Sequence, residues 1–338
     1  MSRKTLAKHS VTVANNRLGG AGATKHQRLQ TCKSFIIWSF QNGHVFNSMV
    51  DVHQEIVRAY LVACKAEGND NSTLHNKLAS IRRVMRSLGK DPDPIGITAK
   101  ECGLSPRNRK GTKEPIPDAV FLAAVAKATE IGKHGLAIVL RLQRLLGHRG
   151  LESLMSIRAL EKCALEASDF LNFEVVVSHG TKGGRYRQTE FIQARAKETL
   201  LVIRDSLIFA KDRHGYLIEG SKKDLKSGVA RYHRLAAQVG LVGIYAPHSL
   251  RYAYCVEKLE EMRDAGLNKD EATKLAARFL GHGDSRARYV SMVYGKTVVH
   301  TLKPERRKKR IDRAIDTINS FIDTALVSSS IASSGLIM

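Results

Sequence analysis

Apolar residues recur at helical spacing through most of this 338-residue chain, which restricts it to a mainly helical fold. The segment 71–89 shows the pattern most clearly, because Asn71 or Ser72 can cap its start and Gly89 lies just past its end. Asp118 is expected to cap a second clear helix. Similar spacing predicts helices over 23–43, 50–68, 118–132, 134–147, 195–211, 228–240, 246–262 and 268–283.

One segment carries the pattern of strands instead. Positions 175–177 and 189–192 are β-prone and flank a glycine-rich, basic turn. Two such runs joined by a turn predict a hairpin. The predicted fold class is therefore mainly α with a small antiparallel β-sheet.

Proline and glycine interrupt the helical pattern at 89–96 and at 105–118, and the second interruption is also strongly basic. The polar N-terminus ends in Gly-Gly-Ala-Gly-Ala, which is typical of a flexible lead-in. The predicted organisation is a flexible segment over 1–22, a helical domain over 23–105, a basic linker over 106–117, a larger domain over 118–300 and a terminal segment over 301–338.

Positive charge dominates the composition, with 55 Lys and Arg against 32 Asp and Glu and a formal net charge of +23. An excess of this size favours a polyanionic partner. The five cysteines are scattered and form no Cys-x-x-Cys pair, so neither a disulfide framework nor a zinc site is expected. Neither a membrane span nor a secretory signal is apparent, and we expect a cytoplasmic protein.

Four segments place cations or hydrogen-bond donors at structurally marked positions. In 246–262 the spacing of three residues between His248 and Arg251 puts both on one helix face, where they meet either solvent or an anion. The other three segments set Arg149 at a helix start three residues before Glu152, Lys182 at the tip of the predicted hairpin, and His282 after a helix-ending glycine. Each residue taken singly also fits an ordinary surface or core position.

In this order the four segments resemble the tyrosine recombinase (phage integrase) family. "LLGHRGLESLMS" is similar to its Gly-x-Arg-x-x-Glu box and "GTKGGRYRQTEFI" to its Gly-Lys-Gly hairpin. "PHSLRYAYC" resembles the His-x-x-Arg box and "FLGH" the Leu-Gly-His that precedes the nucleophile. The resemblance covers 114–296 and, more loosely, 24–88. It implies a helical core-binding (SAM-like) N-terminal domain and an α+β catalytic domain.

The resemblance also implies a chemistry that suits these residue types. Arg149 and Arg251 would neutralise the scissile phosphate, because a guanidinium is always charged and binds two phosphate oxygens at once. His282 would donate a further hydrogen bond, and His248 would accept the tyrosine proton or hold the phosphate. Lys182 would protonate the departing 5′ oxygen. The product is a 3′-phosphotyrosyl link, formed without metal, ATP or other cofactor.

The nucleophile departs from the family's spacing. Typical members carry it about nine residues after the histidine of Leu-Gly-His, but Ser291 stands there in this chain. Tyr294 is favoured because apolar residues precede it, and Tyr289 is the alternative. Glu152 would hold the arginine cluster rather than act on DNA.

The resemblance implies a duplex DNA partner at specific recombination sites, a homotetramer on DNA, and accessory DNA-bending proteins, in the service of a mobile genetic element. The apolar stripe of 304–326 would dock on a neighbouring protomer or fold back on its own domain. Two other functions stay open, a recombinase-like architectural protein that does not cut DNA and a type IB topoisomerase. The residues expected to contact DNA are Lys77, Arg82, Arg83, Arg86, Arg107, Arg109, Lys110 and Arg185.

Overall fold

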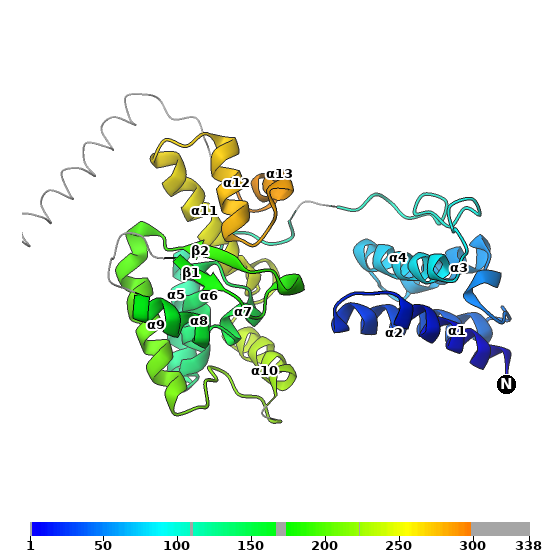
Figure 1. Cartoon of the computed structure of the whole chain (residues 1–338), viewed down its shortest axis with the longest axis horizontal. Coiled ribbons are helices and arrows are strands. Elements are labelled where there is room, and N and C mark those ends of the chain that lie inside the picture. Colours follow the sequence, from blue (N-terminus) through cyan, green and yellow to red (C-terminus); the bar gives the residue numbers. More distant parts are fainter. Residues whose placement is uncertain (1, 109–110, 167–173, 223, 299–338) are drawn as a thin grey trace, which may run out of the picture. The chain divides into compact units, whose positions relative to one another are not determined.

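The computed structural model describes residues 2–108, 111–166, 174–222 and 224–298 (Figure 1). Contacts within the chain divide it into two units, Met1–Arg109 and Lys110–Met338, and the division falls inside the segment predicted as a linker. The described residues confirm a mainly helical chain with one two-stranded antiparallel sheet. The predicted helix within 304–326 lies outside them.

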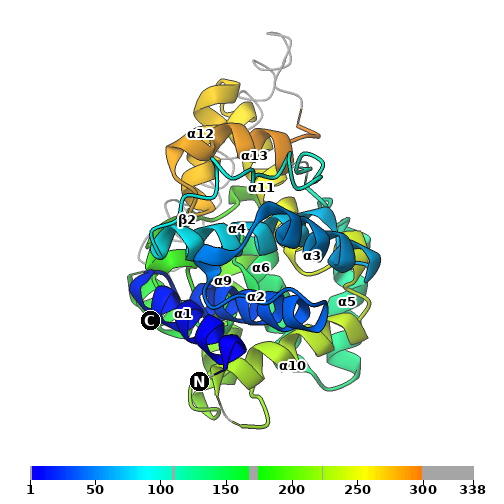
Figure 2. The same ribbon diagram turned by 90° about the vertical axis from the view of Figure 1, so that its right-hand side faces the viewer.

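The N-terminal unit is a bundle of four α-helices around an apolar core (Figure 2). The ring of Phe35 lies at the centre, 5.2 Å from the ring of Tyr60 and 6.1 Å from that of Phe46. The only tryptophan of the chain, Trp38, packs against the same core. The elements are α1 (Arg3–Arg17), α2 (Gly22–Gln41), a 3-10 turn η1 (Met49–Asp51), α3 (Gln54–Ala66) and α4 (Asn71–Ser87).

The segment 1–22 was predicted to be flexible, but α1 occupies residues 3–17 of it. α1 packs against α2 and α4 and buries Ala7, Val11 and Ala14 completely. Arg28 of α2 fixes the end of α1, because its Nε donates to Asn15 Oδ1 over 2.7 Å. The prediction failed because the buried face of α1 consists of two alanines, one valine and one asparagine, which together give little apolar signal.

The N-caps of two helices differ from those that the sequence predicted. Asp70, rather than Asn71 or Ser72, caps α4, since its Oδ1 accepts from the backbone N–H of Thr73 over 2.6 Å. Asp118 is the first residue of its helix and not the cap. Both shifts are of one or two residues.

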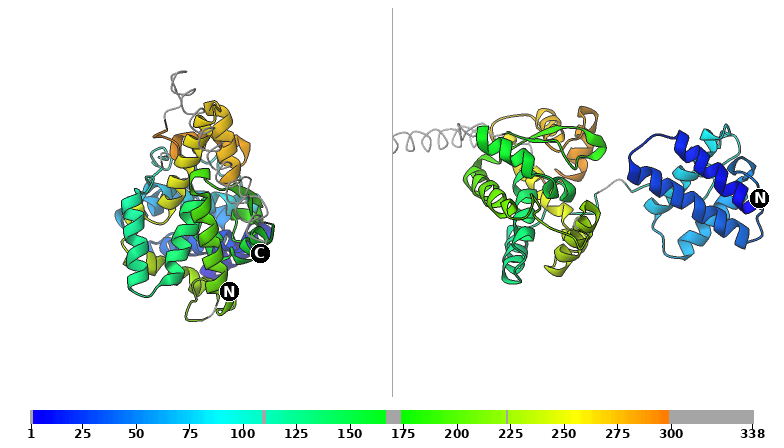
Figure 3. Two further views of the ribbon diagram at one scale, coloured as in Figure 1. Left: turned by 90° about the vertical axis from the view of Figure 1, so that its left-hand side faces the viewer. Right: turned by 60° about the horizontal axis from the view of Figure 1, so that its bottom comes forward.

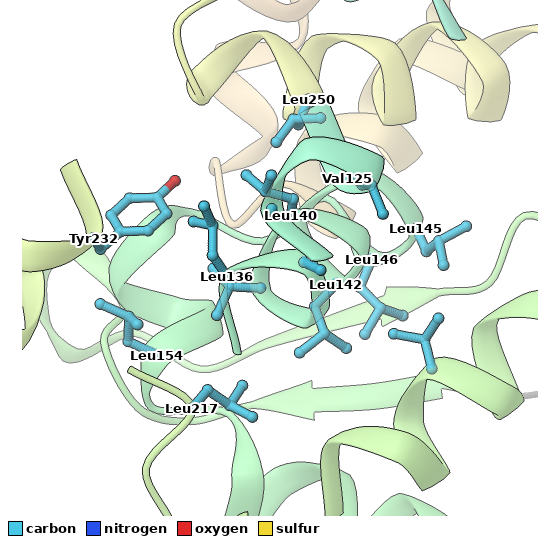
Figure 4. Packing of buried hydrophobic residues seen from close by; sticks show 14 of the residues in the cluster. Val125, Leu136, Leu140, Leu142, Leu145, Leu146, Leu154, Leu217, Tyr232 and Leu250 are labelled. Atoms are coloured by element: carbon cyan, nitrogen blue, oxygen red, sulfur yellow. The ribbon is translucent and has the colours of Figure 1, made fainter. Parts of the chain in front are cut away.

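The C-terminal unit surrounds one buried helix. Leu136, Leu140 and Leu146 of α6 lie at the centre of its core, and α5, α9 and α11 pack around them (Figure 4). Figure 3 shows the units from two further sides, with the N-terminal unit in blue and cyan. The helices are α5 (Asp118–Glu130), α6 (His134–Leu146), α7 (Gly150–Leu154), α8 (Ile157–Glu166), α9 (Ala196–Lys211), α10 (Leu225–Gln238), α11 (His248–Asp264), α12 (Lys269–Phe279) and α13 (Ala287–Val293).

The predicted hairpin pairs β1 (Glu174–Val177) with β2 (Arg187–Glu190). Glu174 lies opposite Glu190 and Val177 opposite Arg187, so the second strand begins two residues before the predicted 189–192. The shift brings a charged residue, Arg187, into the buried face of the strand. Short 3-10 turns connect these elements, η2 (Lys182–Gly184), η3 (Gln193–Arg195), η4 (Gly243–Tyr245) and η5 (Asp284–Arg286).

A smaller third core joins α11, α12 and α13. Tyr252, Tyr254 and Leu259 of α11 pack there against Ala276 of α12 and Val293 of α13. This core holds the last described helix beside the end of α12. Among the described residues, no helix combines the length and the apolar content that crossing a membrane requires.

Truncating Val11 to alanine will test whether α1 is part of the N-terminal core. The change removes buried apolar volume and should lower the free energy of unfolding of this unit by about 2 kcal/mol. Denaturant unfolding of the full chain, followed by the fluorescence of Trp38, measures that unit alone. Leu6→Ala is the control, because Leu6 lies on the same helix with 39% of its surface exposed. Equal effects of the two changes would contradict the packing of α1.

Candidate active site

The end of α6 creates the first part of the site. Gly147 ends the helix in the left-handed conformation, with φ 60°, and a Cβ at this position would lie 2.4 Å from the ring of Tyr254. Only glycine satisfies both conditions. The turn then presents Arg149 as the N-cap of α7, where its backbone N–H donates to Glu152 Oε2 over 2.7 Å.

Glu152 is a fully buried carboxylate on which three arginines converge. Its Oε1 accepts from Arg149 Nη1 over 2.5 Å, and its Oε2 accepts from Arg187 Nη2 over 2.8 Å. Arg251 Nη1 lies 3.6 Å from Oε2. Burial alone would raise the pKa of Glu152, but Arg187 and Arg251 outweigh it and hold that pKa well below its ordinary value. The carboxylate is therefore charged, and the cluster keeps a net positive charge.

Arg251 joins two distant parts of the chain to this cluster. It lies on the first turn of α11, fully buried, and donates from Nη1 to the carbonyl of Gly147 over 2.5 Å and from Nη2 to the carbonyl of Leu280. Burial, followed by the charges of Arg187 and Arg149, lowers its pKa to about 10. Arg251 therefore still carries its charge at neutral pH.

Two histidines face the same region in their neutral forms. His248 opens α11, one turn before Arg251, and His282 follows the glycine turn after α12. Burial is the main cause that lowers the pKa of each to about 4, and the charges of Arg251 and Arg149 lower it further. The Nε2 of His282 is buried without a hydrogen-bond partner among the described residues. It is available to a ligand that enters the site.

Tyr294 lies directly after α13 and is 3% exposed. Its hydroxyl lies 3.2 Å from His248 Nε2, and the ring of Tyr252 packs with its centre 4.3 Å away. Burial raises the pKa of Tyr294, while the charge of Arg251 and a hydrogen bond with it act in the opposite direction. The phenol is thus held between a base and a guanidinium.

The alternative tyrosine lies close by but has different neighbours. Tyr289, on α13, is half-buried, and its ring centre is 5.8 Å from that of His282 and 6.1 Å from that of Tyr294. The guanidinium of Arg286 lies 5.9 Å from the ring. Tyr289 therefore lines the site on the side of His282.

The structure brings together five of the six residues expected to act, Arg149, His248, Arg251, His282 and Tyr294. The sixth, Lys182, lies exposed at the η2 turn of the hairpin. Its charge contributes to the lowered pKa of His282, which places it on the same side of the unit.

Two residues of the cluster escaped prediction from sequence. His148 is buried beside the arginines with both ring nitrogens unpartnered among the described residues, and burial, then Arg187, lowers its pKa to about 3. Nothing in the local pattern marked it. Arg187 had a signal, because it shares the inward face of β2 with Thr189 at the strand period of two.

The residues expected to contact DNA divide into several groups. In the N-terminal unit, Arg82, Arg83, Arg86 and Arg107 line one cavity of about 680 Å³ beside α4. Asp93 forms ion pairs with both Arg82 and Arg86, which partly neutralises this surface.

Of the other four residues, Lys77 and Arg185 do not line this cavity. Lys77 donates to the Tyr60 hydroxyl over 3.3 Å. In the C-terminal unit, Arg185 is exposed beside a cavity of about 500 Å³ that His282 also lines. Arg109 and Lys110 lie outside the described residues. Within the described ranges, no group of three or more His, Cys, Asp or Glu side chains could hold a metal ion.

Comparisons with known proteins concern the fold of the chain. Residues 103–257 match the family model described as Integrase. Among solved structures, the fold resembles the Tn1549 transposon integrase in complex with transposon right-end DNA, with a TM-score of 0.55 and 16% identity over 93% of this chain and 100% of that one. No curated protein matches the sequence.

Two structures of lambda integrase share the fold as well. A tetramer bound to a Holliday junction has a TM-score of 0.51 and 14% identity over 82% of this chain and 76% of that one. A dimer bound to a COC′ core site has a TM-score of 0.51 and 17% identity over 88% and 79%. The family match covers just under half of the chain, and the solved structures show that the chain shares the fold of these integrases.

Acid should destabilise the C-terminal unit through its buried histidines. Burial lowers the pKa of His148 from its ordinary 6.5 to about 3 in the folded chain, so between these pH values the unfolded chain binds a proton that the folded chain does not. Stability then falls as the pH falls through this window, by at most about 1.4 kcal/mol per pH unit for one histidine. The variant His148→Leu should show a shallower slope.

Denaturant unfolding at pH 7 and pH 5 measures this effect. Near-UV circular dichroism of tyrosine is the probe, since every tyrosine except Tyr60 belongs to the C-terminal unit. His134→Gln serves as the control, because His134 is exposed in the same unit. Identical slopes for wild type and His148→Leu would show that His148 does not carry the dependence.

Proposed function

We propose that this chain is a tyrosine recombinase that cleaves and rejoins DNA strands at specific sites through a 3′-phosphotyrosyl intermediate, without metal or ATP, for a mobile genetic element. One observation carries the proposal. The hydroxyl of Tyr294 lies 3.2 Å from His248 Nε2, at a site where buried Arg251 and partly exposed Arg149 supply positive charge. A nucleophile, a base and a phosphate site therefore occur together.

Arg149 and Arg251 would stabilise the negative charge that develops on the scissile phosphate. As the scissile phosphate passes through its pentavalent state, negative charge grows on its non-bridging oxygens, and preformed guanidinium groups stabilise that charge. Arg149 is suited to this contact, because 22% of its side chain is exposed while Glu152 holds one end. The unpartnered Nε2 of His282 would donate to a non-bridging oxygen.

His248 and Lys182 would carry out the two proton transfers. The Tyr294 oxygen attacks phosphorus as its proton moves to His248, the bond between phosphorus and the 5′ oxygen breaks, and Lys182 gives that oxygen a proton. The low pKa of His248 arises from burial and from the arginines, and an arriving phosphate opposes the arginine field. DNA binding would therefore make His248 a stronger base. A 5′ hydroxyl from another strand reverses each transfer.

Assembly on DNA is proposed from the relatives. Lambda integrase has been solved as a tetramer on a Holliday junction and the Tn1549 integrase on transposon DNA. We propose that this chain likewise acts as a tetramer on duplex sites, with the N-terminal unit as the core DNA-binding domain and the C-terminal unit as the catalytic domain. Its basic N-terminal cavity and its net charge of +23 support a phosphate-rich partner.

Covalent trapping tests the chemistry and the nucleophile together. The full chain is incubated with nicked duplexes from the ends of its own element, with a chelator present, and resolved under denaturing conditions. We expect a protein–DNA adduct that Tyr294→Phe abolishes and Tyr289→Phe preserves, because only the hydroxyl of Tyr294 is placed against His248.

The other outcomes are equally informative. Loss of the adduct in Tyr289→Phe alone would assign the nucleophile to Tyr289. Absence of any adduct with wild type, while salt-sensitive DNA binding persists, would support the architectural function instead.

Asp93 should restrain DNA binding by the N-terminal unit. It pairs with Arg82 and Arg86, so Asp93→Asn releases both guanidinium groups from this carboxylate, while Asp91 still lies 3.6 Å from Arg86 Nε. We expect tighter binding and a slope of log K against log salt that is steeper by about 1 to 2. Titrations of a labelled duplex at several salt concentrations measure both quantities. Glu67→Gln is the matched control, since it removes the same charge from an exposed site outside the cavity. An equal gain in both variants would show a general charge effect only.

A further inference from the structure

Arg187 is a buried arginine at the start of β2, and its three acceptors belong to three separate segments. Its Nη2 donates to Glu152 Oε2 over 2.8 Å and to the carbonyl of Gly147 over 3.3 Å, and its Nη1 donates to the carbonyl of Phe279. Only 2% of the side chain is exposed. Arg187 is therefore positioned to organise the site and is shielded from a DNA phosphate.

The acceptors lie next to the residues expected to act. The carbonyl of Gly147 is two residues before Arg149, and the carbonyl of Phe279 is three residues before His282. Arg251 donates to the carbonyl of Gly147 as well, and to that of Leu280. The two guanidinium groups therefore join the same two chain turns, one from the hairpin and one from α11.

The turn that carries His282 rests directly on the Arg187 side chain. Gly281 has a φ of 63°, and a Cβ added there would lie 2.7 Å from Arg187 Cδ. The aliphatic part of the arginine thus supports the backbone, while the guanidinium binds its last helical carbonyl. Both contacts restrict where His282 can point.

Arg187 also affects which arginines the Glu152 carboxylate binds. A buried carboxylate takes up as many cationic donors as reach it. Glu152 Oε2 accepts from Arg187 Nη2 and from the backbone N–H of Arg149, its Oε1 accepts from the Arg149 guanidinium, and Arg251 stays 3.6 Å away. Without Arg187, the carboxylate would draw Arg149 and Arg251 toward itself and away from a phosphate.

We propose that Arg187 is a positioning residue for strand cleavage, which holds Glu152 and the ends of α6 and α12 so that Arg149, Arg251 and His282 face one phosphate. The inference rests on the proposed function, since it concerns the same site. It assigns to the hairpin a role beyond carrying Lys182. Arg187 acts through its neighbours and has no contact with the substrate.

The test compares two buried arginines of one unit. Arg187→Lys keeps the charge but cannot reach three acceptors with one ammonium group. Arg144→Lys is the matched control, because Arg144 is also buried against carboxylates, Asp118 and Glu257, away from the site. Single-turnover adduct formation at saturating DNA is measured for the full chain, together with thermal melting and DNA affinity.

We expect Arg187→Lys to form the adduct about 100-fold more slowly than wild type while its DNA affinity is retained, since small misplacement of catalytic groups has effects of that size. Arg144→Lys should react at the wild-type rate. A methylphosphonate at the scissile position adds a readout that a merely structural role would not move. A methylphosphonate carries no charge, so its cleavage depends less on correctly placed arginines. The difference in the rate of adduct formation between Arg187→Lys and wild type should therefore become smaller.

The remaining outcomes overturn the inference. If wild type and Arg187→Lys form the adduct at equal rates, or if the methylphosphonate leaves the gap unchanged, Arg187 does not position the arginines. Arg187→Gln is the second variant, because it leaves no unpaired buried cation. If both variants melt below the assay temperature, Arg187 serves the fold alone. A wild-type chain without any adduct would overturn the proposed function as well, which separates the two failures.

Discussion

The arrangement of the site in the C-terminal unit depends on the interaction of the buried Glu152 carboxylate with three arginines. A buried charge is costly unless it is paired and hydrogen-bonded, and here Arg149 and Arg187 bind it directly while Arg251 lies close by. One carboxylate cannot neutralise three guanidinium groups. The site therefore keeps positive charge in a region of low dielectric, where electrostatic interactions are strong.

The fold explains how such a cluster can form at all. Its members come from the end of α6, from β2, from α11 and from the turn after α12, and each of the three arginines donates to a backbone carbonyl of another segment. Carbonyls at helix ends lack partners within their own helix and are natural acceptors for buried arginines. The packing of α6 at the centre of the core fixes where its end lies.

The sequence predicted the parts of this structure that have a local signature. Arg149, His248 and Arg251 stand in short motifs with fixed spacing, and the amphipathic pattern located most helices. α1 was missed because its buried face carries only one large apolar side chain, Val11, beside two alanines and an asparagine. Arg187 and His148 were missed because their roles depend on contacts between segments far apart in the chain, and spacing along the sequence does not encode such contacts.

The burial of Tyr294 has a consequence for the free protein. With its hydroxyl bonded to His248 and its pKa raised by burial, the phenol rests in its protonated, unreactive form. Under the proposed function, a phosphodiester would supply the counter-ion for the surplus positive charge around it. The DNA backbone would then complete the electrostatics of the site, and reactivity would be a property of the complex and not of the polypeptide alone.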